Sequence, residues 1–290
     1  MNQKVPINHP SITLEIKRED LLHPYISGNK FRKLKYNLQH ASALGATTLL
    51  TFGGAFSNHV VAVAADGAEF DFQTIGIIRG EELAHKYLEN PTLALAEKMG
   101  MKLLFIKRQQ YKNKDLSSVQ DELPINYYTI PEGGTNEFAI KGCEEILTEN
   151  DGEFDYICCA VGTGGTIVGI SNSAKKHQKV IGFPALKADL YDDIKKLTNN
   201  KNWLLQTEYH FGGYAKVSAE LIHFINTFYK DYNIKLDPIY TGKLVYGVID
   251  LIAKNYFPEN SKILIVHTGG LQGISGMNQK LKSKNLPLID

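Results

Sequence analysis

"YICCAVGTGGTIVG", residues 156–169, joins an apolar run to a glycine-rich turn and then to a second apolar stretch. The run 156–162 has the continuous apolar character of a strand that is buried on both faces of a parallel sheet. Glycines after such a strand let the chain turn tightly into a helix, so that successive backbone N–H groups converge on an anion. Thr163 and Thr166 add hydroxyl donors. An ordinary strand-to-helix turn without a ligand is the alternative interpretation.

The spacing of these glycines excludes two common nucleotide sites. After Gly162 and Gly164, a dinucleotide-binding fingerprint requires a glycine at the position of Ile167. A nucleotide P-loop requires a Lys-Ser/Thr pair after the loop, and none follows. A cradle for a small phosphate group, without a dinucleotide or a metal ion, therefore fits the pattern best.

The alternation of strand and helix patterns continues along the chain. Strands are predicted at 47–52, 73–79, 102–107, 127–130, 156–162, 179–185 and 262–270. Helical patterns separate them, including those at 90–100, 166–177, 188–199, 215–230 and 242–256. This order predicts an α/β protein with two doubly wound parallel-sheet domains. We place the smaller domain at 44–140 and the larger one at 1–43 and 141–290.

Composition excludes several classes of partner. The formal charge of the 290 residues is +1, so there is no broad field to attract nucleic acid or an anionic membrane. No apolar run could span a bilayer, and the N-terminal residues lack the apolar segment of a signal peptide. Cys143, Cys158 and Cys159 have no metal-ligand spacing, which predicts reduced core side chains. We expect a soluble cytoplasmic protein.

"SGNKFRKL", residues 27–34, puts Lys30 directly after a Gly-Asn pair, where a turn should lead into a helix. A solvated lysine is the ordinary interpretation, and Lys33 and Lys35 are better candidates for that role. The positive end of a helix disfavours an ammonium ion, so it lowers the pKa of a lysine placed there and favours the neutral nucleophile. A lysine of this kind beside a phosphate cradle predicts pyridoxal 5'-phosphate as the cofactor.

Six blocks carry a resemblance to a known family. They are "KREDLLHPYISGNKFRKLKYNL" (17–38), "GGAFSNH" (53–59), "PEGGTN" (131–136), "GTGGTIVG" (162–169), "LDPIYTGK" (236–243) and "HTGG" (267–270). In this order they resemble the pyridoxal-phosphate enzymes of the D-cysteine desulfhydrase and 1-aminocyclopropane-1-carboxylate deaminase family, from Lys17 to Gly276. The resemblance implies the fold-type II architecture, with the smaller lobe inserted in the larger, the cofactor between the lobes, and a homodimer.

The resemblance also implies roles for individual residues. Lys30 is similar to the lysine that holds the cofactor as an internal aldimine, and Asn58 to the residue bonded to the phenolic oxygen of the cofactor. Ser57 resembles a serine that binds the substrate carboxylate or transfers a proton. Tyr214 and Tyr240 match two tyrosines near the substrate. The glycine-rich loop of this chain resembles the loop that holds the cofactor phosphate in the family; it consists of Gly162, Thr163, Gly164, Gly165 and Thr166.

The environment of the pyridine nitrogen separates the two activities of the family. The deaminase branch has a glutamate at the position of Thr241, whereas the desulfhydrase branch uses a threonine that matches Thr268. A hydroxyl stabilises a protonated ring less than a carboxylate does, which suits β-elimination better than cyclopropane opening. Phe56, where many relatives have glutamine, predicts a changed substrate pocket.

The sequence therefore predicts β-elimination from a small amino acid such as D-cysteine, giving pyruvate, ammonia and sulfide. Lys30 is expected to act as the general base. The alternatives are 1-aminocyclopropane-1-carboxylate deaminase, an amino-acid racemase or dehydratase of the same fold, and a non-catalytic α/β protein that binds a phosphate ligand.

Overall fold

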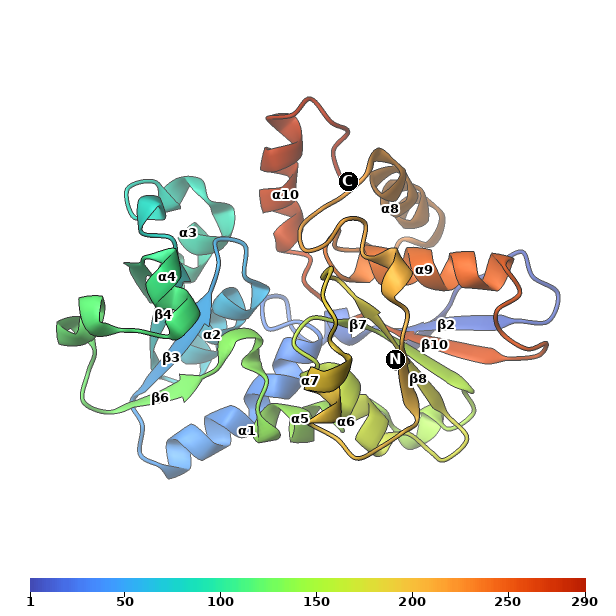
Figure 1. The fold of residues 1–290 in the computed structure, drawn as a ribbon, viewed down its shortest axis with the longest axis horizontal. Helices are drawn as coiled ribbons and strands as arrows, with labels where there is room; N and C mark the ends of the chain where they lie inside the picture. The colour runs from blue at the N-terminus through green and yellow to red at the C-terminus, as the bar shows by residue number, and fades with distance from the viewer.

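The computed structural model describes residues 1–290 and contains two β-sheets in separate lobes (Figure 1). The strands are β1 (Asn2–Lys4), β2 (Thr13–Lys17), β3 (Thr48–Gly53), β4 (Gln73–Arg79), β5 (Lys102–Ile106), β6 (Tyr127–Ile130), β7 (Tyr156–Val161), β8 (Lys179–Pro184), β9 (Trp203–Leu205) and β10 (Lys262–Val266). The helices are α1 (Asn29–Ala43), α2 (Asn58–Glu69), α3 (Pro91–Lys98), α4 (Arg108–Asn113), α5 (Glu137–Cys143), α6 (Gly165–Ser173), α7 (Tyr191–Lys195), α8 (Ala219–Tyr232), α9 (Thr241–Ala253) and α10 (Gly273–Lys282). No helix has the length and apolarity needed to cross a membrane.

The smaller sheet has the strand order β5-β4-β3-β6, and all of its neighbouring strands are parallel. Successive residues of β3 point to opposite faces, so each face buries its own apolar cluster. Leu49 packs with side chains of α1, α2 and α3, whereas Leu50 packs with Tyr111 of α4 and Val119. Helical segments therefore cover both faces, as the continuous apolar character of these strands predicts.

The larger sheet has the order β1-β2-β10-β7-β8-β9 and is also covered on both faces. Cys158 belongs to the cluster under α8 and α9, and its neighbour Cys159 to the cluster under α6 and α7. Both cysteines and Cys143 are buried and reduced, as expected. The sheet differs from the expectation at its edge, because β1 is antiparallel to β2.

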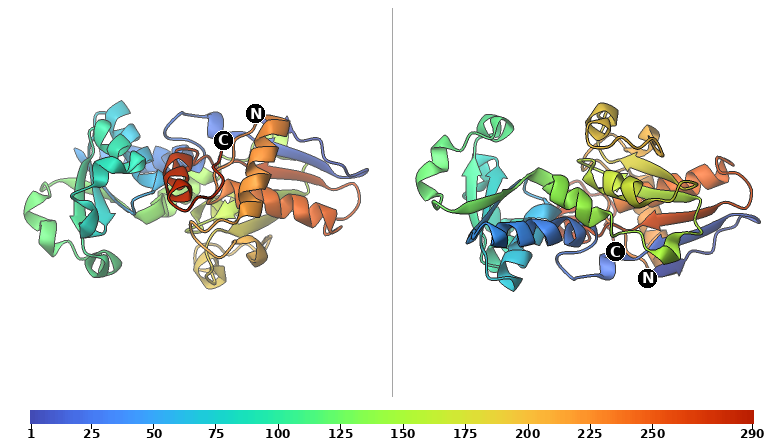
Figure 2. Two further views of the ribbon diagram at one scale, coloured as in Figure 1. Left: turned by 90° about the horizontal axis from the view of Figure 1, so that it is seen from above. Right: turned by 90° about the horizontal axis from the view of Figure 1, so that it is seen from below.

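The smaller sheet uses only residues 48–130, while the larger sheet uses segments on both sides of this range. The smaller lobe is therefore inserted in the larger one, which confirms the predicted fold class; the domain limits at 44 and 140 stay a prediction. The lobes lie at opposite ends of the molecule, and α1 runs from one toward the other (Figure 2). It packs against α5, where a Cβ on Gly142 would lie 1.9 Å from the carbonyl oxygen of Arg32.

Three strands escape prediction from the sequence. β1 and β9 have three residues each, too few to show a period. Apolar and polar residues alternate in β2, "TLEIK", which pairs with β10. The charged residues Glu15 and Lys17 make this strand hard to recognise from the sequence. The helical pattern at 188–199 is wrong in extent, because α7 covers only Tyr191–Lys195.

Candidate active site

Four loops rich in glycine, serine and threonine follow the two pairs of neighbouring strands at which each sheet reverses its winding direction. In the larger sheet β7 and β10 are neighbours, and their C-terminal ends lead into residues 162–165 and 267–270. In the smaller sheet β3 and β6 are neighbours, and they lead into 54–57 and 131–136. Ligands of doubly wound sheets bind at such switch points because two adjacent loops separate there.

These loops surround a cavity of about 600 Å³ that takes side chains from both lobes. The predicted site residues that line it are Lys30, Ser57, Asn58, Gly162, Thr163, Gly164, Thr166, Tyr214, Tyr240 and Thr268. Gly165 is the exception, since it packs behind the loop, where a Cβ would lie 2.9 Å from Thr135 Oγ1. The topology thus brings together residues separated by more than 200 positions in the sequence.

Lys30 lies in the first turn of α1, as the sequence predicts. The preceding Gly28 has φ +62°, and a Cβ there would stand 2.1 Å from the backbone carbonyl of Thr268. Only glycine allows both this conformation and this approach. Gly28 therefore lets the start of α1 lie against the loop after β10, which places Lys30 in the cavity.

The pKa of Lys30 is lowered from 10.5 to about 7, firstly by burial and secondly by the positive charge of Lys33. The sequence expectation named the helix N-terminus as the cause, so the direction agrees and the main cause differs. The expectation that Lys33 is solvated is wrong. Lys33 is 2% exposed and donates to Gly133 O (3.0 Å) and Thr135 Oγ1 (3.1 Å). Lys35 is solvent-facing and paired with Glu145.

Ser57 and Asn58 begin α2 at the cavity wall. The Ser57 hydroxyl accepts a hydrogen bond from Val60 N (3.3 Å) as the helix N-cap, so its own proton stays available to a ligand. Asn58 Oδ1 is buried without a hydrogen-bond partner. A buried carbonyl oxygen of this kind is costly unless a ligand satisfies it.

The loop between β7 and α6 has the unpaired donors of an anion site. The backbone amides of Gly162, Thr163 and Gly164 donate to no backbone oxygen. The first amides of α6 also lack partners inside the helix, as in every helix. Gly164 has φ +86° and is the N-cap of α6, so the unpaired amides stand at the N-terminus of that helix, where anions bind. The donor set suits a phosphate group.

Two tyrosines stand on the wall of the larger lobe. The rings of Tyr214 and Tyr240 meet edge to face, with centroids 6.2 Å apart. Burial raises the pKa of Tyr240 well above its usual value and also raises the pKa of Tyr214. Both hydroxyls therefore remain protonated near neutral pH and can donate hydrogen bonds into the cavity.

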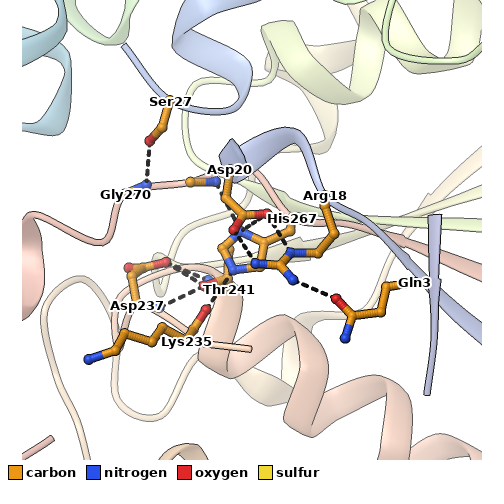
Figure 3. A network of polar contacts seen from close by, with 10 residues as sticks. Gln3, Arg18, Asp20, Ser27, Lys235, Asp237, Thr241, His267 and Gly270 are labelled. Carbon is orange, nitrogen blue, oxygen red and sulfur yellow. Dashed lines mark hydrogen bonds and ion pairs between the residues drawn. The ribbon is translucent and has the colours of Figure 1, made fainter. Parts of the chain in front are cut away.

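A polar network holds the loop after β10 from behind (Figure 3). His267 is 1% exposed; its Nδ1 accepts from Gly269 N, so its Nε2–H donates to Lys235 O (2.7 Å). Asp20, which Arg18 binds through two hydrogen bonds, lies 3.7 Å from the same ring. These contacts fix the neighbouring Thr268, which faces the cavity.

Thr241 lies behind the cavity wall. Its hydroxyl donates to Asp237 Oδ1 (2.8 Å) and accepts from Asp237 N (2.8 Å), as Figure 3 shows. It is fully buried and does not line the cavity. Glu132 is the only acidic residue in the lining, and its carboxylate is paired with Lys114 (2.9 Å).

Sequence reasoning missed several lining residues, chiefly Lys33, Arg79, Arg108 and Glu132. Lys33 is three positions after Lys30 and so shares its helix face, which is a usable signal. Arg79 is the last residue of β4, at the sheet edge where ligands bind. His59 also lines the cavity; it is buried, with its Nε2 2.9 Å from Thr51 Oγ1 and its Nδ1 without a hydrogen-bond partner.

Comparison with known proteins agrees with this geometry. The model of the family "Pyridoxal-phosphate dependent enzyme" matches residues 6–269. The chain is a pyridoxal-phosphate dependent enzyme. This pyridoxal-phosphate enzyme is 30% identical to a putative 1-aminocyclopropane-1-carboxylate deaminase of Pyrococcus horikoshii, over 97% of this chain and 93% of that protein. It is 31% identical to the bifunctional D-cysteine desulfhydrase/1-aminocyclopropane-1-carboxylate deaminase, mitochondrial, of Arabidopsis thaliana, over 90% of this chain and 73% of the relative.

Solved structures show the same fold. The crystal structure of an ACC deaminase homologue superposes with a TM-score of 0.79 at 28% identity, covering 93% of this enzyme and 88% of that chain. O-ureido-L-serine synthase superposes with a TM-score of 0.70 at 14% identity, covering 94% and 89%, which shows the fold alone. The unpaired Asn58 Oδ1 and the free loop amides fit the cofactor of the family.

Proposed function

We propose that the enzyme catalyses β-elimination from a small amino acid in the manner of a D-cysteine desulfhydrase, releasing pyruvate, ammonia and sulfide. The observation that carries this choice is the lining of the cavity. It offers the hydroxyl of Thr268 and no free carboxylate, because Glu132 is already paired with Lys114. A hydroxyl supports a protonated pyridine weakly, which is sufficient when a good leaving group departs.

Several residues are proposed to hold the cofactor. Lys30 would bind it covalently, and the amides and hydroxyls from Thr163 to Thr166 would hold its phosphate. The side-chain amide of Asn58 would form a hydrogen bond with the phenolic oxygen of the cofactor. Thr268 would face the ring nitrogen. Pyridoxal phosphate bound in this way supplies a sink for the electron pair left when the Cα–H bond breaks.

Side chains of the enzyme are proposed to carry out the remaining steps. The hydroxyl of Ser57 is proposed to donate a hydrogen bond to the substrate carboxylate. The hydroxyls of Tyr240 and Tyr214 are proposed to donate hydrogen bonds to groups near the β-carbon. The Nζ atom of Lys30 accepts the α-proton; its lowered pKa keeps a large neutral fraction at neutral pH. The Cβ–S bond then breaks with its electron pair on sulfur, and water converts the released 2-aminoacrylate to pyruvate and ammonia.

1-Aminocyclopropane-1-carboxylate deaminase is the second candidate, because the names of the relatives include that activity. The two are separated by product analysis after incubation with D-cysteine, L-cysteine and 1-aminocyclopropane-1-carboxylate. Pyruvate and sulfide from a cysteine, without 2-oxobutanoate from the cyclopropane, support the proposal. 2-Oxobutanoate alone would overturn it in favour of the deaminase.

A homodimer and a cytoplasmic location are proposed from the family resemblance. Sedimentation of the purified enzyme tests the first, with a mass twice the 32.4 kDa of the chain expected. Fractionation of the source cells tests the second.

A further inference from the structure

Arginine is rare in this chain and is paired almost everywhere it occurs. Three of the four arginines form ion pairs with carboxylates: Arg18 with Asp20, Arg32 with Glu19, and Arg108 with Glu82. Arg79 is the fourth, and no carboxylate lies within ion-pair distance of it. A guanidinium presents a planar fork of N–H donors that matches a carboxylate. The one arginine without an acidic partner lines the cavity.

Arg79 lies beside the loop that carries Ser57. Its Nη2 stands 3.2 Å from the position that a Cβ on Gly54 would take, while Ser57 Oγ stands 2.8 Å from the corresponding position on Gly53. Consecutive Cα atoms are about 3.8 Å apart, so the guanidinium and the hydroxyl flank one short stretch of backbone. The ring of Tyr111 also contacts the guanidinium, since its centroid lies 5.6 Å from Arg79 Cζ, within cation–π distance.

The charges around the cavity leave Arg79 free for a ligand. The lining contains Lys30, Lys33, Arg79 and Arg108 against the single acid Glu132. Glu132 is held by Lys114, and Glu82 holds Arg108. Lys30 and Lys33 lie deeper, near the loops assigned to the cofactor. Arg79 is therefore the exposed cation next to the proposed substrate loop.

We propose that Arg79 binds a second acidic group on the substrate, so that the enzyme acts on amino acids whose β-substituent ends in a carboxylate. S-carboxymethylcysteine represents this class. The inference rests on the proposed β-elimination: the α-proton goes to Lys30, and the Cβ–S bond breaks with its electron pair on sulfur. The mercaptocarboxylate leaves, and 2-aminoacrylate takes up water to give pyruvate and ammonia. Ser57 binds the α-carboxylate and Arg79 the distal one.

The test uses two ligands that differ only in charge, S-carboxymethylcysteine and its amide, S-carbamoylmethylcysteine, in both D and L forms. The wild-type holoenzyme is expected to favour the acid by about 10- to 100-fold in kcat/KM, the effect of one charge-assisted bidentate contact. Arg79→Gln should bring this ratio to about one. Lys112→Gln removes an exposed, unpaired cation from α4 of the same lobe and should leave the ratio unchanged.

Two results would overturn the inference. One is a wild-type ratio near one. The other is an equal fall in kcat/KM for both ligands in Arg79→Gln, which would place Arg79 on the α-carboxylate instead. D-cysteine is assayed in parallel, and its failure to give pyruvate would overturn the proposed elimination. The Arg79 inference is then still decided by binding, from the ligand concentrations that change the visible absorbance of the bound cofactor.

Discussion

The lowered pKa of Lys30 predicts the pH at which the cofactor-free enzyme captures pyridoxal phosphate. Only the neutral amine attacks an aldehyde, so the capture rate follows the neutral fraction of Lys30. With a pKa of about 7 instead of 10.5, that fraction at pH 7 rises from below about 0.1% to about one half. The structure thus predicts a rate about a thousandfold higher than for a solvated lysine, with a midpoint near pH 7.

The assay is stopped-flow absorbance of the forming covalent complex across a pH series. Each rate is divided by the rate constant, per neutral amine, of a free lysine analogue with the same cofactor at the same pH, so that ionisations of the cofactor cancel and the neutral fraction of Lys30 remains. Lys33→Met removes the second cause of the shift and should move the midpoint upward. Lys35→Met, in the same helix but solvent-facing, should not move it. A normalised rate without a plateau below pH 9 would refute the electrostatic reasoning.

Three further predictions concern stability, each measured by urea unfolding. Gly28→Ala should cost about 2 kcal/mol more than Gly45→Ala, because both glycines have positive φ but only Gly28 meets backbone; equal costs would contradict the close approach. Asp66 is 3% exposed and its pKa is raised by burial from 3.8 to about 8. The unfolded state therefore releases its proton first, and folding loses stability as pH rises from about 4 to 8. Between pH 5 and pH 7 the free energy of unfolding of Asp66→Asn should rise relative to that of the wild type by about 1.4 kcal/mol per pH unit, and a pH-independent difference would refute this. Lys17→Met leaves buried Asp151 without its ion-pair partner and should cost about 3 kcal/mol; a neutral result would show that the remaining hydrogen bonds of Asp151 suffice.

Elements with a strong local signal were predictable. The apolar runs of β3, β4, β7, β8 and β10 mark strands buried on both faces, and glycines mark the turns after them. Because carboxyl ends of parallel strands share one edge, loops that follow neighbouring strands of a sheet lie together, as they do in this cavity. The edge strands β1 and β9 could not be predicted, since three residues show no period.

Side-chain environments set by distant segments escaped prediction. Lys33 donates to Gly133 and Thr135, about 100 positions away; its spacing from Lys30 indicates the shared helix face but not these partners. Thr241 was compared with a glutamate near the ring nitrogen, yet its hydroxyl is engaged by Asp237. Periodicity reports which face of an element is buried, whereas the partners of a polar side chain depend on how separate loops meet.

The assignment of Lys30 as the cofactor lysine is the central claim, and one measurement tests it directly. Borohydride reduction of the holoenzyme turns the lysine–cofactor linkage into a stable amine, and mass spectrometry of the digested protein locates it. We predict that the cofactor is found on Lys30 in the peptide "SGNKFRKL". Recovery of the cofactor on Lys33, which is buried and only three residues away, or on any other lysine, would contradict the account.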